Sequence, residues 1–69
     1  MPVFEVALYN RKVRDLVEQG EHHPELNDEW ADTHYIEVRA PSEEAARAKM
    51  EVSRPRANGY VIDNITEVD

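Results

Sequence analysis

Apolar and polar residues alternate in two stretches of the chain, which is the pattern of a strand with one buried face. In residues 3–9, one face gathers Phe4, Val6 and Leu8. In residues 33–40, the same spacing gathers His34, Ile36, Val38 and Ala40. A third stretch, residues 60–68, is rich in β-branched side chains. We therefore expect three strands, over about 3–9, 33–40 and 60–68.

The period changes to that of a helix after the first strand. Val13, Leu16 and Val17 fall at i, i+3 and i+4, so they predict a helix over about 11–19. Asn10 is a suitable N-cap, and Gly20 a suitable C-terminal stop. Basic residues occupy the first turn, which opposes the helix dipole, so we expect tertiary packing to stabilise this helix.

A second helix is predicted to begin at Glu43 and to end before Pro55. Ser42 can cap its first turn, and the residue preceding a proline is disfavoured in helical conformation. We expect a narrow apolar stripe made of Ala45, Ala48 and Val52, flanked by Ala46 and Met50.

The remaining segments are predicted to be connections. Residues 21–32 show little periodicity, although Pro24 can open a single turn that brings Leu26 and Trp30 to one side. Asn58-Gly59 is a turn signal. In the last strand, Ile62 and Ile65 cannot share a face without a shift of phase, so we expect a β-bulge near residues 63–64.

These elements predict a single α+β domain over residues 1–69. A crossover of about 19 residues joins the second and third strands, which favours a parallel relation between them. The first strand can then lie between them as an antiparallel centre, or beside them, and we prefer the central position. We expect a three-stranded mixed sheet in β-α-β-α-β order, split βαβ-like, with two short helices on one face. The pattern resembles half of a ferredoxin-like domain, a likeness that implies no function.

So small a fold leaves one face of its sheet uncovered. Val3, Ala7, Tyr9 and Tyr35 are expected to project from that face, with Tyr60 as a further candidate. Tyrosines are enriched at interfaces because they combine an apolar ring with a polar tip. We therefore expect a homodimer; the alternative is that these rings lie singly among charged neighbours and contact only water.

The chain is acidic, with 15 Asp and Glu against 8 Lys and Arg and a net charge of −7. This balance repels phosphate backbones, so we expect no direct nucleic-acid binding. Seven acids and no basic residue lie between Asp15 and Asp32. A basic protein is therefore a candidate partner. The residues expected to contact partners are Tyr9, Leu26, Asp28, Glu29, Trp30 and Tyr35.

Candidate catalytic and metal-binding residues are few. His22, His23 and His34 have suitable donor groups, but their spacing matches no metal motif, and we expect no metal site. Cysteine is absent. With glycine only at positions 20 and 59, no phosphate-binding loop is expected, and hence no nucleotide cofactor.

The function expected is that of a non-enzymatic accessory or regulatory protein acting through protein-protein contacts. One alternative is a metal- or small-molecule-binding protein with a site at the dimer interface. If such a dimer is an enzyme, the candidate active site is a cleft at that interface containing His34, Tyr35 and Glu37. Another is an acidic inhibitor that imitates nucleic-acid phosphates. The chain shows neither a signal peptide nor a membrane-spanning segment, so we expect a soluble cytoplasmic protein with no membrane partner.

Overall fold

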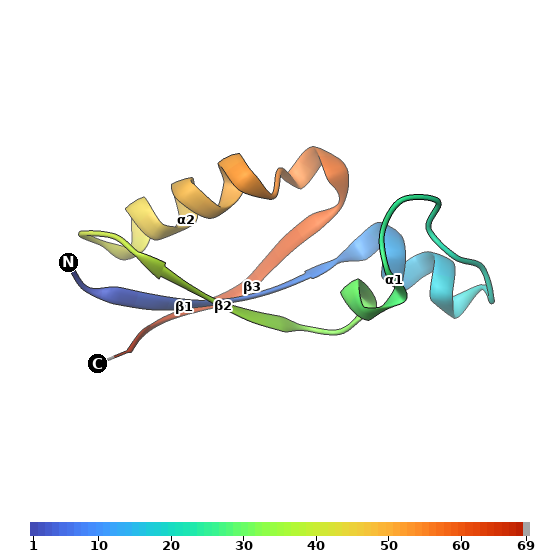
Figure 1. Ribbon diagram of the computed structural model, residues 1–69, viewed down its shortest axis with the longest axis horizontal. Helices are drawn as coiled ribbons and strands as arrows, with labels where there is room; N and C mark the ends of the chain where they lie inside the picture. Colours follow the sequence, from blue (N-terminus) through green and yellow to red (C-terminus); the bar gives the residue numbers. More distant parts are fainter. Residues whose placement is uncertain (69) are drawn as a thin grey trace.

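The computed structural model describes residues 1–68 of the chain. It is elongated, with extents of 41 × 20 × 15 Å. The expected α+β class is confirmed (Figure 1). In chain order the elements are β1 (Val3–Asn10), α1 (Arg11–Glu18), the 3₁₀ turn η1 (Asp28–Ala31), β2 (His34–Arg39), α2 (Glu43–Ser53), the 3₁₀ turn η2 (Arg56–Asn58) and β3 (Tyr60–Val68).

The strand order is β2-β1-β3, with β1 in the centre and antiparallel to both neighbours. β2 and β3 therefore run parallel to each other, as the helical crossover between them predicts. The expected split arrangement is confirmed. The two parallel strands are not neighbours, because β1 separates them. Each hydrogen-bonded pair of strands in the described chain is therefore antiparallel, and the sheet is mixed only through the relation of β2 to β3.

A bulge in β3 lets both of its isoleucines reach the core. Ala7 pairs with Asn64 and the next residue, Leu8, pairs with Ile62, which leaves Asp63 as an extra residue. The shift returns Ile62 to the same side of the sheet as Ile65. Ile65 is buried and Ile62 packs against the core, so the bulge expected at residues 63–64 is confirmed.

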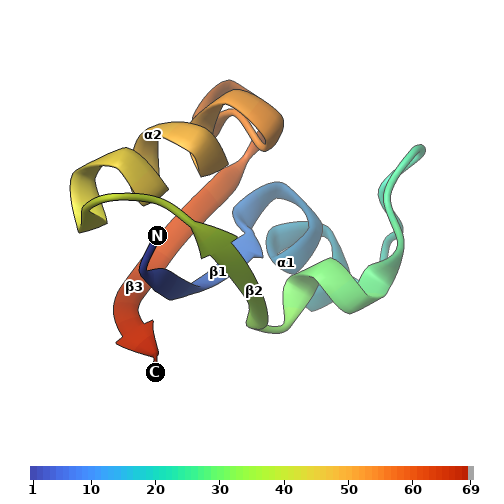
Figure 2. The same ribbon diagram turned by 60° about the vertical axis from the view of Figure 1, so that its left-hand side comes forward.

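The core lies between this side of the sheet and α2, which crosses the sheet diagonally (Figure 2). Its buried residues are Phe4, Val6, Leu8, Ala40, Ala46, Met50 and Ile65. The stripe expected on α2 was wrong. Ala46 and Met50, one turn apart, face the sheet with Ala45 beside them, whereas Ala48 is exposed and Val52 is 83% exposed. The side chain of Met50 spans the distance from helix to sheet, so it decides which face of α2 is buried.

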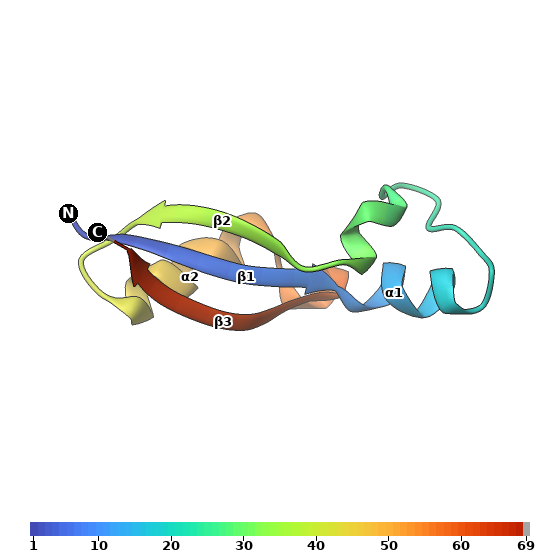
Figure 3. The ribbon, with the colours of Figure 1, turned by 90° about the horizontal axis from the view of Figure 1, so that it is seen from below.

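The expectation that both helices cover one face was also wrong, because α1 lies beyond the end of the sheet and beside η1 (Figures 1 and 3). The helix begins at the residue that follows β1, so no loop exists in which the chain could turn back. Val13 is its fully buried residue. A Schellman motif at Gly20, with φ of 77°, ends the helix: Glu21 N–H donates to the Leu16 carbonyl over 2.8 Å.

Asn10 joins α1 to the turn before β3. Its side chain is fully buried, its Oδ1 accepts from Val13 N–H at 3.1 Å, and its Nδ2 donates to the Asn58 carbonyl at 3.1 Å. Gly59 has φ of 99°, and a Cβ there would lie 2.7 Å from Asn10 Oδ1. The turn therefore requires glycine both for its backbone conformation and for its close approach to Asn10.

Candidate functional site

The side of the sheet opposite α2 forms the first candidate site, which we call the open face. Directly paired residues of antiparallel strands point to the same side, so β1 contributes Val3, Glu5, Ala7 and Tyr9 to this face. β2 contributes Tyr35, Glu37 and Arg39, and β3 contributes Val61, Asn64, Thr66 and Val68. In the view from below, the three strands lie in front of α2 and no described helix lies in front of them (Figure 3).

The open face combines apolar side chains with charges. Tyr35 is 66% exposed and lies directly opposite Ala7. Glu5 and Glu37 face each other across the strands, a like-charged pair that disfavours the isolated sheet. Arg39 follows on the same side of β2, yet among residues 1–68 no ion pair connects it to either glutamate.

Tyr9 is held on the open face by an arginine from α1. The guanidinium carbon of Arg14 lies 3.6 Å from the centre of the Tyr9 ring, and its Nε donates to the Ala31 carbonyl at 2.8 Å. A basic residue that opposes the dipole of α1 is thus used in tertiary contacts between β1, α1 and η1. The tyrosine ring is consequently only partly exposed.

Tyr60 does not join the open face, and the candidate placement there was wrong. It pairs with the buried Asn10 and points to the core side. Its ring meets Trp30 edge-on, with centroids 5.2 Å apart, and Trp30 stacks on His34 at 4.4 Å. Trp30 is partly buried and packs against the core of its own chain. Its expected role as a partner anchor remains a prediction.

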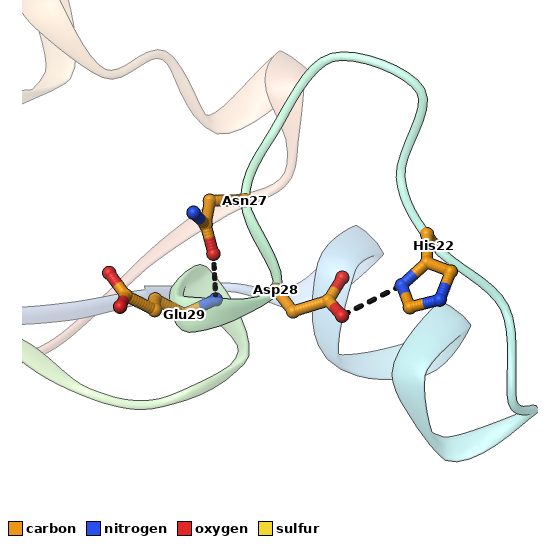
Figure 4. A network of polar contacts seen from close by, with 4 residues as sticks. All are labelled: His22, Asn27, Asp28 and Glu29. Atoms are coloured by element: carbon orange, nitrogen blue, oxygen red, sulfur yellow. Dashed lines mark hydrogen bonds and ion pairs between the residues drawn. The ribbon is translucent and has the colours of Figure 1, made fainter.

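The acidic segment 15–32 extends over α1, the loop after it and η1, and each of its seven carboxylate residues is exposed. Leu26, in the loop, is partly buried. His22 Nδ1 lies 2.7 Å from an Asp28 carboxylate oxygen, and Asn27 caps η1 by accepting from Glu29 N–H at 2.9 Å (Figure 4). The partner contacts predicted for Leu26, Asp28 and Glu29 are not decided by this geometry.

The three histidines have separate local partners. His23 Nδ1 accepts from the backbone N–H groups of Glu25 and Leu26, while His34 Nε2 donates to the Glu29 carbonyl at 2.8 Å. Within residues 1–68, no three His, Asp or Glu side chains are grouped to hold a metal ion. The cleft containing His34, Tyr35 and Glu37 does not form within one chain, because β2 turns His34 to the opposite side of the sheet from the other two.

A second candidate site, a group of arginine side chains, was not predicted from the sequence. Arg11, Arg47, Arg54 and Arg56 line one cleft with Glu51. Residues 54 and 56 flank Pro55, but their approach to Arg11 requires the packing of β3 beside β1. The seven-residue spacing of Arg47 and Arg54, two helical turns, was the available local signal.

No protein-family model, curated protein or solved structure matches this chain. Neither helix in the described part of the chain has the length and apolar character needed to cross a membrane.

Proposed function

We propose that this protein is a small accessory module that acts through protein-protein contact, and that its open face binds the open face of a second copy. The observation that carries the proposal is the exposure of this face, with Tyr35 on the edge strand β2 66% exposed. Val3, Val61 and Val68 add partly buried apolar surface on the same side. Covering these side chains removes apolar surface from water.

The charges of the open face also support a second copy as the occupant. A twofold axis brings the same surface of both copies together, so a residue on one can meet a different residue on the other. Arg39 of one copy can then approach the Glu5–Glu37 pair of its partner. That contact would relieve the repulsion between two glutamates that lie directly opposite within one chain.

The size of the face limits the strength of the association. Eight residues of β1 extend about 26 Å, and three strands are about 14 Å wide, which gives a footprint of about 370 Å². Stable complexes usually bury about 800 Å² on each partner. We therefore expect a dimer in exchange with monomer, with a dissociation constant between micromolar and millimolar.

Sedimentation velocity from about 10 µM to about 1 mM tests this proposal. The wild-type sedimentation coefficient is expected to rise with concentration, and Tyr35→Glu is expected to remain monomeric because it adds a third carboxylate to the face. Val52→Glu is the matched control, since Val52 is 83% exposed on the outer side of α2. A wild type that stays monomeric throughout, or a Val52→Glu variant that dissociates equally, would refute the proposal.

A further inference from the structure

The arginine-lined cleft is bounded by α2, η2 and the first residues of β3, and it has a volume of about 440 Å³. Arg47 comes from α2, Arg54 from the end of that helix, Arg56 from η2, and Arg11 from the start of α1. The volume lies within the range of small-molecule sites, about 300–1,000 Å³. Elements distant in sequence thus bring four arginines to one concave surface.

The charge of this cleft is opposite to that of the whole protein. Four arginines and Glu51 give the lining a formal charge of +3, whereas the chain carries −7, so the rest of the chain carries −10. The chain has 15 Asp and Glu residues that could form ion pairs with these arginines. Yet among residues 1–68 the ion pair found is His22–Asp28, and it includes no arginine.

Three of the four basic residues outside the cleft have side-chain hydrogen bonds, and the exception is Arg39 on the open face. Lys12, Arg14 and Lys49 each donate to a backbone carbonyl. For the guanidinium groups of the four cleft arginines, the part of the chain that the structure describes supplies no acceptor. Four positive charges gathered around a single carboxylate, Glu51, repel one another, and a bound anion would reduce that repulsion.

Arg54 is the least exposed of the four. Its guanidinium carbon lies 4.9 Å from the centre of the Trp30 ring and 5.8 Å from that of Tyr60. Its Nε is buried and has no hydrogen-bond partner in the described residues. Contact with two aromatic rings restricts the guanidinium before a ligand arrives, which lowers the entropy lost on binding.

We propose that this cleft binds a small molecule that carries two or more linked phosphate groups. Arginine matches phosphate oxygens through paired hydrogen bonds, and a local charge of +3 suits a multiply charged anion. The −10 carried by the rest of the chain opposes a long polyanion such as nucleic acid. With glycine only at positions 20 and 59, the chain has no glycine-rich loop whose backbone could bind phosphate. The arginine side chains therefore recognise the phosphate groups.

Isothermal titration calorimetry at low salt, with pyrophosphate and with ADP as separate ligands, tests the assignment. The double variant Arg47→Gln/Arg56→Gln is expected to bind at least about tenfold more weakly than wild type, because two charge-assisted contacts are lost. Both residues are exposed, and circular dichroism checks that the variant folds. Lys49→Gln is the matched control: it removes an exposed basic residue of α2 that does not line the cleft, and it should leave pyrophosphate affinity unchanged.

The two ligands distinguish the source of the phosphates. Equal affinities indicate recognition of the diphosphate alone, while tighter ADP binding indicates that a nucleoside also contacts the cleft. The proposal is overturned by the absence of binding to either ligand at about millimolar concentration, or by equal weakening in the Lys49→Gln control. It is also overturned if a single-stranded oligonucleotide binds more tightly than both, or if the arginines prove to hold the acidic segment of another copy.

Discussion

Replacement of Asn10 by alanine should destabilise the fold more than any other single polar substitution in the described chain. The side chain is fully buried and makes two hydrogen bonds, one to each of two segments. Loss of the helix cap costs about 1 kcal/mol. The Asn58 carbonyl, left without its donor, adds about 1–3 kcal/mol. We expect the free energy of unfolding to fall by about 2–4 kcal/mol.

This loss is large compared with the stability expected for the chain. At about 0.05–0.15 kcal/mol per residue, 69 residues give roughly 3–10 kcal/mol in total. Urea unfolding followed by Trp30 fluorescence measures the effect. With an m-value of about 1 kcal/mol/M, the midpoint should fall by about 2–4 M, or the variant should be unfolded without urea.

Two further variants separate the contributions of Asn10. Asn10→Ser keeps an oxygen that can cap α1 but lacks the amide donor, so its stability should lie between those of wild type and Asn10→Ala. Asn27→Ala removes another N-cap, which is exposed and belongs to a short 3₁₀ turn. Its cost should stay below about 1 kcal/mol. Equal midpoints for Asn10→Ala and Asn27→Ala would refute the reasoning.

Two more pairs of substitutions can be compared by the same urea assay. Gly20→Ala should lower the free energy of unfolding by about 1–2 kcal/mol, because residue 20 has a left-handed backbone conformation. Gly59→Ala should lower it by more, because the new Cβ would lie 2.7 Å from Asn10 Oδ1, whereas a Cβ at residue 20 meets open space. Equal costs would contradict the close approach. Met50→Ala should lower the free energy of unfolding by about 2–4 kcal/mol, since Met50 is buried, whereas Val52→Ala should change it by less than about 0.5 kcal/mol. A larger loss for Val52→Ala than for Met50→Ala would show that α2 buries its other face.

Local interactions explain why much of the secondary structure can be predicted from the sequence. Asn10 and Ser42 cap helices through bonds to residues three positions away, and Gly20 ends α1 within the same turn. Pro55 limits α2 from outside. The bulge at Asp63 also follows from local spacing, because Ile62 and Ile65 must return to one face. These features depend on side chains only a few residues apart.

The features that were predicted wrongly depend on distant contacts. Whether Ala46 or Ala48 faces the sheet is decided by the fit of Met50 against the core. Tyr60 turns inward because β3 pairs it with Asn10, fifty residues earlier in the chain. The helical period and the β-propensity of these segments allow either orientation, so packing decides between them.

The sequence by itself determined the three strands, the two helices and their caps, the parallel relation of the strands on either side of the crossover, and the existence of an uncovered sheet face. Only the tertiary structure decided that α1 lies beyond the sheet and that four arginines line one cleft. The physical reason is the separation of the interacting residues along the sequence. Helix caps, hydrophobic periodicity and β-bulges depend on residues that are close together in the chain. The cleft instead requires β3 to pair with β1, so that η2 and the end of α2 meet the start of α1.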